Sequence, residues 1–281
     1  MTASNLDHLR AQLTDRDHAV LCDVERFRLL STKQIQRLHF DAVHPTPLAA
    51  ARACTRALSR LHDLGILRHL SRRIGGVRAG SAGYVWYIGP VGDRLLKALT
   101  PRTRPGRRNY REPSLHFVAH TLAIAEVAVQ VREAERRDTV EVLTLQTEPA
   151  SWQPSLSEHG ILQTLKPDLQ LALALGDDEH HWFIEIDRAT EHLPVIVRQC
   201  QAYQLFFATG RYQATHDVFP CIVWVAPDRR RQTQLAHRIA TDPKIDDRLF
   251  TVITTAEVGL TLHLEERDIN QLGGQEGGIS S

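Results

Sequence analysis

The architecture of the first hundred residues is set by a short segment that reads Leu61-His62-Asp63-Leu64-Gly65-Ile66-Leu67. Gly65 is typical of a helix end, because glycine readily adopts the left-handed conformation of a C-terminal cap. We therefore predict a helix that begins near Leu48 and ends at this point. The residues that follow favour two strands, Ile66 to Ile74 and Gly83 to Ile88, joined by a glycine-rich loop.

Two capped helices are expected before this one. Thr14 is followed three residues later by Asp17, which predicts a capping-type start for a first helix that extends to about Leu30. Ser31 is the expected cap of a second, short helix. The prolines at positions 45 and 47 then break the chain before the third helix. Three helices followed by a two-stranded hairpin is the order of a winged helix-turn-helix.

Charge is distributed unevenly along the chain, although the formal net charge is only +1. Residues 1–110 contain 19 Lys and Arg against 8 Asp and Glu, whereas residues 111–281 contain 15 against 25. A basic half of this kind is typical of a domain that binds a polyanion, and we expect double-stranded DNA to be the partner. The acidic half must have another role.

The third helix carries three arginines at intervals of four residues, Arg52, Arg56 and Arg60, which predict one basic stripe. The face expected to be buried opposite this stripe consists of Leu48, Ala51, Cys54, Leu58 and Leu61. Such a helix would lie in the major groove, where arginine reads guanine edges or contacts phosphates. Further arginines on the expected hairpin would hold the DNA backbone or the minor groove: Arg68, Arg72, Arg73 and Arg78. The alternative is an ordinary solvated face.

The remaining residues alternate helical and extended patterns. A helix is expected from Gly89 to Leu99, and residues 101–112 are typical of a basic linker. Next we expect a helix, three strands, a helix, a strand, a helix and a last strand, with an irregular segment from Trp152 to Lys166. Their ranges are Ser114–Arg136, Val140–Leu145, Asp168–Leu175, His181–Asp187, Val195–Phe207, Phe219–Ala226, Arg229–Ala240 and Leu249–Thr254. The predicted fold is α/β (α+β), with a DNA-binding domain at 1–100, a second domain at 113–256 and a tail at 257–281.

Three carboxylates of the second domain occupy neighbouring strand ends. Asp168 opens one expected strand, and Glu185 and Asp187 end the next. Since residues two apart in a strand point to the same face, Glu185 and Asp187 would project together, and Asp168 would join them across the hairpin. Such a cluster repels itself unless a divalent cation neutralises it, and Mg²⁺ or Mn²⁺ suits these oxygen ligands. The alternative is a set of acids at a solvated edge.

The order α-β-β-β-α-β resembles the PD-(D/E)xK nuclease-like superfamily, in which an Asp and a Glu bind the metal. The resemblance implies that Asp168 and Glu185 are metal ligands and that Glu126, on the first helix, completes the site. Members of the superfamily carry a Lys two residues after the second acid, whereas this chain has Asp187 there. Some members move the basic residue to the next helix, where this chain has Arg198.

The whole layout resembles the plasmid replication-relaxation family of bacteria over about residues 13–255. The resemblance is carried by Tyr84-Val85-Trp86-Tyr87-Ile88, by Pro167-Asp168, by Phe183-Ile184-Glu185-Ile186-Asp187-Arg188-Ala189-Thr190-Glu191 and by Tyr203 one helix later. It implies a protein of a mobile element that binds DNA and acts in replication, transfer or relaxation.

Two functions remain open at this point. If the second domain is active, it cleaves phosphodiesters as a metal-dependent nickase. Asp168 and Glu185 would then bind the metal, Asp187 or Glu126 would complete its ligands, and Arg198 would hold the phosphate. The alternative is a non-catalytic DNA-binding regulator whose second domain serves dimerisation or the docking of other mobile-element proteins. Tyr203 is either a core aromatic residue, which we favour, or a site residue.

Other sites find little support. The four cysteines have no C-x-x-C spacing, which argues against a zinc site and against a disulfide framework. His116 and His120 are four residues apart, as metal ligands on a helix are, but local hydrogen bonding is the alternative. No apolar segment is long enough to span a membrane, and no signal-peptide pattern opens the chain. We expect a cytoplasmic protein, and a homodimer by analogy with helix-turn-helix proteins that read paired half-sites.

Overall fold

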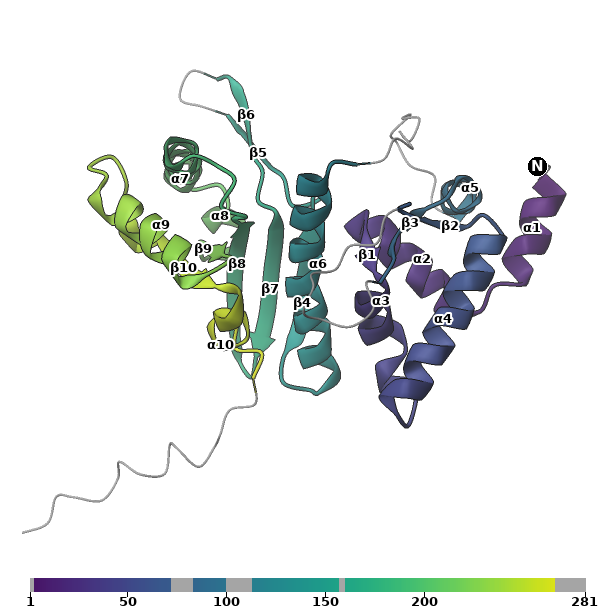
Figure 1. The fold of residues 1–281 in the computed structure, drawn as a ribbon. Helices are drawn as coiled ribbons and strands as arrows, with labels where there is room; N and C mark the ends of the chain where they lie inside the picture. The colour runs from purple at the N-terminus through teal and green to yellow at the C-terminus, as the bar shows by residue number, and fades with distance from the viewer. Residues whose placement is uncertain (1–2, 72–82, 100–112, 157–159, 266–281) are drawn as a thin grey trace, which may run out of the picture. The chain divides into compact units, whose positions relative to one another are not determined.

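The computed structural model describes residues 3–71, 83–99, 113–156 and 160–265, and it is a mixed α/β structure. The chain divides into two compact units (Figure 1). The N-terminal unit comprises residues 1–129 together with two short segments, 146–152 and 166–169. The C-terminal unit comprises the rest: 130–145, 153–165 and 170–281.

Four helices open the N-terminal unit: α1 (Ala3–Ala11), α2 (Asp15–Phe27), α3 (Thr32–His39) and α4 (Pro47–Asp63). The expected caps are confirmed, since Thr14 forms a capping box with Asp17 at α2, and Ser31 forms one with Gln34 at α3. Pro47 occupies the first turn of α4, where a missing N–H group costs no helical hydrogen bond. A short 3₁₀ helix, η1 (Asp41–Val43), precedes α4. The sequence analysis did not predict α1.

A three-stranded antiparallel sheet completes this arrangement. Its strands are β1 (Leu30–Ser31), β2 (Leu67–His69) and β3 (Val85–Ile88), in the order β1-β3-β2. Gly65 has a φ of +68°, so that α4 ends in the left-handed conformation that favours glycine. The loop of the expected hairpin, residues 72–82, lies outside the described residues. After β3 the chain continues into α5 (Pro90–Leu99).

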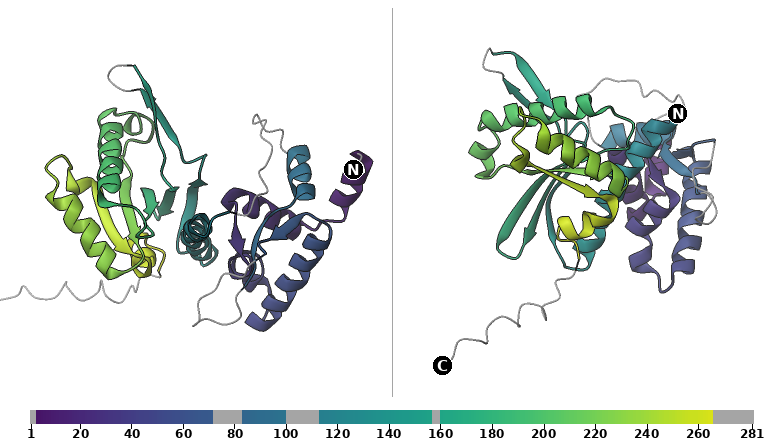
Figure 2. Two further views of the ribbon diagram at one scale, coloured as in Figure 1. Left: turned by 45° about the horizontal axis from the view of Figure 1, so that its top comes forward. Right: turned by 60° about the vertical axis from the view of Figure 1, so that its left-hand side comes forward.

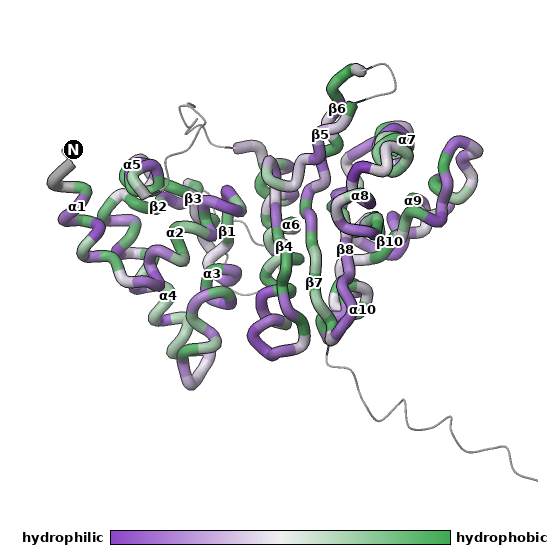
Figure 3. The backbone as a smooth tube through the Cα atoms, turned by 180° about the vertical axis from the view of Figure 1, so that it is seen from behind, coloured by the Kyte–Doolittle hydropathy of each residue, from purple (hydrophilic) through white to green (hydrophobic). Residues whose placement is uncertain are grey.

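The core of the N-terminal unit joins the helices to the sheet. Its fully buried side chains include Leu21, Leu30, Ile35, Leu58 and Leu61. Figure 3 shows hydrophobic and hydrophilic residues alternating along α4, as expected for a helix with one buried face. The first half of α6 (Leu115–Arg136) also belongs to this unit, where Val118 packs with Leu29, Leu70 and Val85.

A five-stranded sheet dominates the C-terminal unit, in the order β10-β9-β8-β7-β4. The strands are β4 (Glu141–Thr147), β7 (Leu169–Leu175), β8 (Asp178–Ile186), β9 (Cys221–Ala226) and β10 (Phe250–Thr254). β8 and β9 are parallel, as are β9 and β10, whereas β7 and β8 form a tight hairpin at Gly176. The expected strands are thus present.

Two long helices cover one face of this sheet, α7 (Leu193–Ala208) and α9 (Arg229–Thr241), with the short α8 (Gln213–His216) after α7 (Figures 1 and 2). Their buried side chains share one core with the sheet: Phe183, Cys200, Tyr203, Trp224, Leu235 and Ile239. None of the helices among the described residues is both long and apolar enough to cross a membrane.

One expectation for this unit is wrong. The segment expected to be irregular forms a hairpin of β5 (Gln153–Leu156) and β6 (Leu162–Leu165). The proline in β5 obscured the strand pattern in the sequence. It does not prevent pairing, because each strand of a two-stranded sheet is an edge strand, where proline is tolerated. After β10 the chain forms two short turns, η3 (Thr255–Glu257) and α10 (Val258–Thr261), and the apolar side chains of Val258, Leu262 and Leu264 are buried. Another 3₁₀ turn, η2 (Asp247–Leu249), leads into β10. Residues 266–281 lie outside the described residues.

Candidate functional site

The basic face of α4 is the first candidate site. Arg52 and Arg56 are both exposed, while Ala50, Cys54 and Leu58 are buried on the other side of the helix. The expected buried face is therefore wrong at two positions. Leu48 is 61% exposed, and Ala50 replaces Ala51 as the buried alanine, because the buried stripe is rotated toward Cys54 and Leu61.

Arg60 does not extend the basic face. Its guanidinium donates to both carboxylate oxygens of Asp17 on α2, at 2.6 and 2.7 Å. Burial raises the pKa of Asp17, but the hydrogen bonds from Arg60 and Thr14 outweigh it and hold that pKa below its ordinary value. Arg60 therefore ties α4 to α2, and its predicted contact with DNA has a competing structural partner.

The predicted basic hairpin is only partly within the described residues. Arg68 on β2 is exposed, whereas Arg72, Arg73 and Arg78 lie outside the described residues. The residue after Arg68, His69, belongs to a cluster of rings. Its ring centroid is 4.9 Å from that of His62 on α4 and 4.0 Å from that of Tyr84. The sequence analysis did not anticipate this ring cluster, because its members come from α4, from β2 and from the residue before β3.

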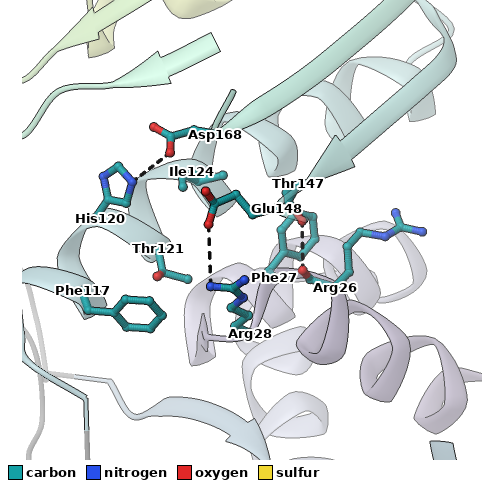
Figure 4. A pocket seen from close by; sticks show the side chains of 10 residues that line it. All are labelled: Arg26, Phe27, Arg28, Phe117, His120, Thr121, Ile124, Thr147, Glu148 and Asp168. Carbon is teal, nitrogen blue, oxygen red and sulfur yellow. Dashed lines mark hydrogen bonds and ion pairs between the residues drawn. The ribbon is translucent and has the colours of Figure 1, made fainter. Parts of the chain in front are cut away.

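Asp168 lies in the N-terminal unit, at a small cavity of about 40 Å³ (Figure 4). Its Oδ1 is 3.0 Å from His120 Nε2 on α6, and the carboxylate is largely buried. Arg28 and Glu148, which line the same cavity, form an ion pair at 3.8 Å. The rings of His116 and His120 are stacked with centroids 6.3 Å apart, but the hydrogen bond of His120 is to Asp168. This partner is 48 residues away in the chain, so the hydrogen bond is a tertiary contact and not the local one that the alternative expected.

Glu126 belongs to a different set of contacts. Its carboxylate accepts hydrogen bonds from Arg37 and from Gln34 on α3, the latter at 3.1 Å. Gln34 also donates to the backbone carbonyl of Leu122, at 2.9 Å. These bonds tie α3 to α6 within the N-terminal unit, and they are the observed role of the acid that the nuclease resemblance placed at a metal.

Glu185 lies on β8 in the C-terminal unit, under α7. The hydroxyl group of Tyr203 donates to its Oε1 at 2.5 Å, and both residues are almost completely buried. Burial, followed by the nearby charge of Glu185, raises the pKa of Cys200 to about 12. Tyr203 is therefore a core aromatic residue whose hydroxyl group also satisfies a buried carboxylate.

Asp187 is paired with Arg231 of α9. Arg231 Nε donates to Oδ2 at 2.7 Å and Nη2 donates to Oδ1 at 3.2 Å, while Nη2 also donates to the carbonyl of Glu191 at 2.8 Å. The side chain of Asp187 is 0% exposed. The sequence analysis missed Arg231, for which the only signal was a run of three arginines at the start of α9. Arg198 is exposed on α7, whereas Tyr203 faces the core.

These contacts test whether the candidate acids fit the role of ligands for the expected Mg²⁺ or Mn²⁺. Within each unit, the described residues contain no group of three or more His, Cys, Asp or Glu side chains arranged to hold a metal ion. Glu126 and Asp187 are each held by a guanidinium, which competes with a cation for the same oxygens. The two acids therefore do not fit a metal-ligand role, and no step through a metal is derived from them.

Comparison with known proteins identifies a protein family. A family profile described as replication-relaxation matches residues 21–222, which is more than half of the chain. No curated protein and no solved structure matches the chain significantly. The matched range contains α4 with its basic face, as well as Asp168, Glu185 and Asp187, whereas Arg231 lies beyond it. This protein is therefore a member of the replication-relaxation family.

Proposed function

We propose that this protein binds double-stranded DNA of a plasmid or another mobile element through its N-terminal unit, in replication or relaxation of that DNA. The observation that carries the proposal is the basic face of α4, where Arg52 and Arg56 are exposed while the apolar face is buried. Arginines on an exposed helix face are suited to guanine edges and phosphates in the major groove.

The order of elements supports the same function. Three helices, α2, α3 and α4, are followed by β2 and β3, and β1 pairs with β3 in an antiparallel sheet. We interpret this arrangement as a winged helix-turn-helix, in which α4 is the recognition helix and Arg68 on β2 begins the basic wing. The excess of 11 positive charges in residues 1–110 supplies long-range attraction to the phosphates.

The test is a DNA-binding titration with the full chain. Fluorescence anisotropy of a labelled duplex is measured at several salt concentrations for wild type and for the variant Arg52→Ala/Arg56→Ala. Each lost phosphate contact lowers the slope of log K against log salt by about 0.9, so we expect weaker binding and a slope reduced by up to about 1.8. The matched control is Arg230→Ala, which removes an exposed arginine from α9.

Two results contradict the proposal. In the first, the wild-type protein fails to bind any duplex at low salt. In the second, the double variant binds as tightly as wild type and with the same salt slope. A loss of binding by Arg60→Ala is not informative by itself, because that substitution also removes the partner of the buried Asp17.

Metal-dependent nicking is a second candidate function. It is favoured by the burial of Asp168 and Glu185, since buried carboxylates are costly to maintain and are frequent at functional sites. The hydrogen bonds of these acids to His120 and Tyr203 favour the non-catalytic regulator instead. Supercoiled plasmid incubated with Mn²⁺ or Mg²⁺ decides between the two. Nicking that is abolished by both Asp168→Ala and Glu185→Ala supports the nickase, and binding without nicking supports the regulator.

A further inference from the structure

The exposed face of α4 is not purely basic. Leu48, the second residue of the helix, is 61% exposed, and Val43 in η1, which contacts α4, is 57% exposed. Among residues 6–71 and 83–98, these are the two large apolar side chains that are strongly exposed. A single exposed leucine is ordinary, but both of these residues lie at the N-terminal end of the helix that carries Arg52 and Arg56.

The helical geometry aligns Leu48 with polar groups suited to base edges. Residues four and seven positions apart share a helix face, which places Leu48, Arg52 and Thr55 in one row. All three are exposed. The acid nearest to this row on α4 is Asp63, at the opposite end of the helix. The first two turns of α4 thus offer an apolar group followed by a guanidinium.

We propose that Leu48 contacts the C5-methyl group of a thymine in the major groove, while Arg52 reads a guanine nearby. This inference rests on the proposed function and specifies the sequence that α4 selects. The thymine methyl is the apolar group that the major-groove edge presents, and guanine offers N7 and O6 to a guanidinium. One helical turn rises about 5.4 Å, against about 3.4 Å per base pair, so the two bases lie one or two base pairs apart.

The charge around Leu48 favours DNA over an apolar protein groove as its occupant. Arg52 and Arg56 follow Leu48 within nine residues, and Arg68 on β2 adds a further exposed positive charge to the same unit. An apolar protein partner would have to desolvate these guanidinium groups, whereas phosphates pair with them directly. The substitution Leu48→Ala is also safe for folding, because an exposed side chain contributes little to stability.

The experiment begins with a library of random-sequence duplexes, from which the full-length wild-type protein selects its preferred sites. Each thymine of a selected duplex is then replaced in turn by uracil, which removes only the methyl group. At one thymine we expect wild-type binding to weaken about fourfold, the effect of one buried methyl group, while Leu48→Ala binds the two duplexes equally. A guanine within two base pairs of that thymine, replaced by 7-deazaguanine, should weaken wild type and not Arg52→Ala.

The control variant is Leu205→Ala, which removes a leucine on α7 that is also 61% exposed. It should respond to uracil as wild type does. The inference is overturned if uracil weakens wild type and Leu48→Ala equally at every position, or if selection yields no sequence preference although the protein binds. Absence of binding to any duplex contradicts the proposed function itself, so the two failures are distinguishable.

Discussion

Asp17 performs two functions at one position. Its carboxylate closes the capping box of α2 and accepts both hydrogen bonds from Arg60 on α4. Because the folded-state pKa lies below the ordinary value, ionised Asp17 stabilises the fold above its unfolded-state pKa, and this contribution is lost as the pH falls through the folded-state pKa. We predict that Asp17→Asn lowers the free energy of unfolding at pH 7 by about 1 kcal/mol, a modest value because Arg60 is partly exposed and solvent screens the pair.

Urea unfolding measured from pH 7 down toward pH 3 tests this prediction. The difference between wild type and Asp17→Asn should shrink as the pH falls, since the wild-type carboxylate then becomes protonated. Asp15→Asn is the control, because Asp15 lies in the same first turn but is exposed. A difference that stays constant over the whole pH range would contradict the assignment of the effect to ionised Asp17.

The four cysteines differ in burial. Burial raises the pKa of the Cys54 and Cys200 thiols to about 12, whereas Cys22 and Cys221 are exposed. Since the thiolate is the nucleophile, we predict that iodoacetamide at about pH 8 labels Cys22 and Cys221 and spares the other two. Mass spectrometry of the peptides measures the labelling, and all four should react in urea. Labelling of Cys54 in the folded protein as fast as Cys22 would disprove the prediction.

Among the elements, α9 is fixed to the end of β8 by the ion pair between Arg231 and Asp187. The Asp187 side chain is fully buried and that of Arg231 is 11% exposed, so removal of the arginine leaves the carboxylate charge uncompensated and away from water. We predict that Arg231→Met destabilises the protein by about 3–5 kcal/mol, and that the double variant Asp187→Asn/Arg231→Met recovers a large part of this loss. The measurement is the free energy of unfolding in urea.

Arg230→Met is the matched control for this pair, because Arg230 is exposed on the same turn of α9. Its effect should stay within about 0.5 kcal/mol of wild type. If Arg231→Met is as stable as this control, the buried ion pair does not hold α9. If the single and double variants are equally unstable, the loss comes from packing of the Arg231 side chain rather than from the unpaired carboxylate.

Local signals made most elements predictable from the sequence. The caps at Thr14 and Ser31 and the glycine at 65 depend on neighbours within three residues, and the helices and strands next to them lie where expected. The partners of the candidate site residues were not predictable. Asp187 and Arg231 are 44 residues apart, and His120 and Asp168 are 48 apart, so only tertiary folding brings them together. The sequence analysis placed Leu48 on the buried face of α4, whereas it is exposed. Helical spacing alone does not fix which residue lies at the centre of the buried face to better than one position.

At the scale of the whole molecule, the contacts of α6 decide where a stable N-terminal fragment can end. The sequence analysis expected a boundary before this helix, and residues 1–129 form the main part of the compact N-terminal unit. Val118 on α6 is fully buried against Leu29, Leu70 and Val85, and Glu126 accepts hydrogen bonds from α3. A fragment that stops at residue 112 loses these contacts and exposes part of the core.

We therefore predict that a fragment of residues 1–112 is less stable than a fragment of residues 1–136, which retains all of α6. The expected difference in unfolding free energy is at least about 2 kcal/mol, since burial of one valine contributes about 1.5–3 kcal/mol. Thermal unfolding followed by circular dichroism measures it, and Val118→Ala in the longer fragment should move its midpoint toward that of the shorter one. If both fragments melt at the same temperature, α6 contributes nothing to the N-terminal unit, and the DNA-binding part ends before residue 113, as the sequence analysis predicted.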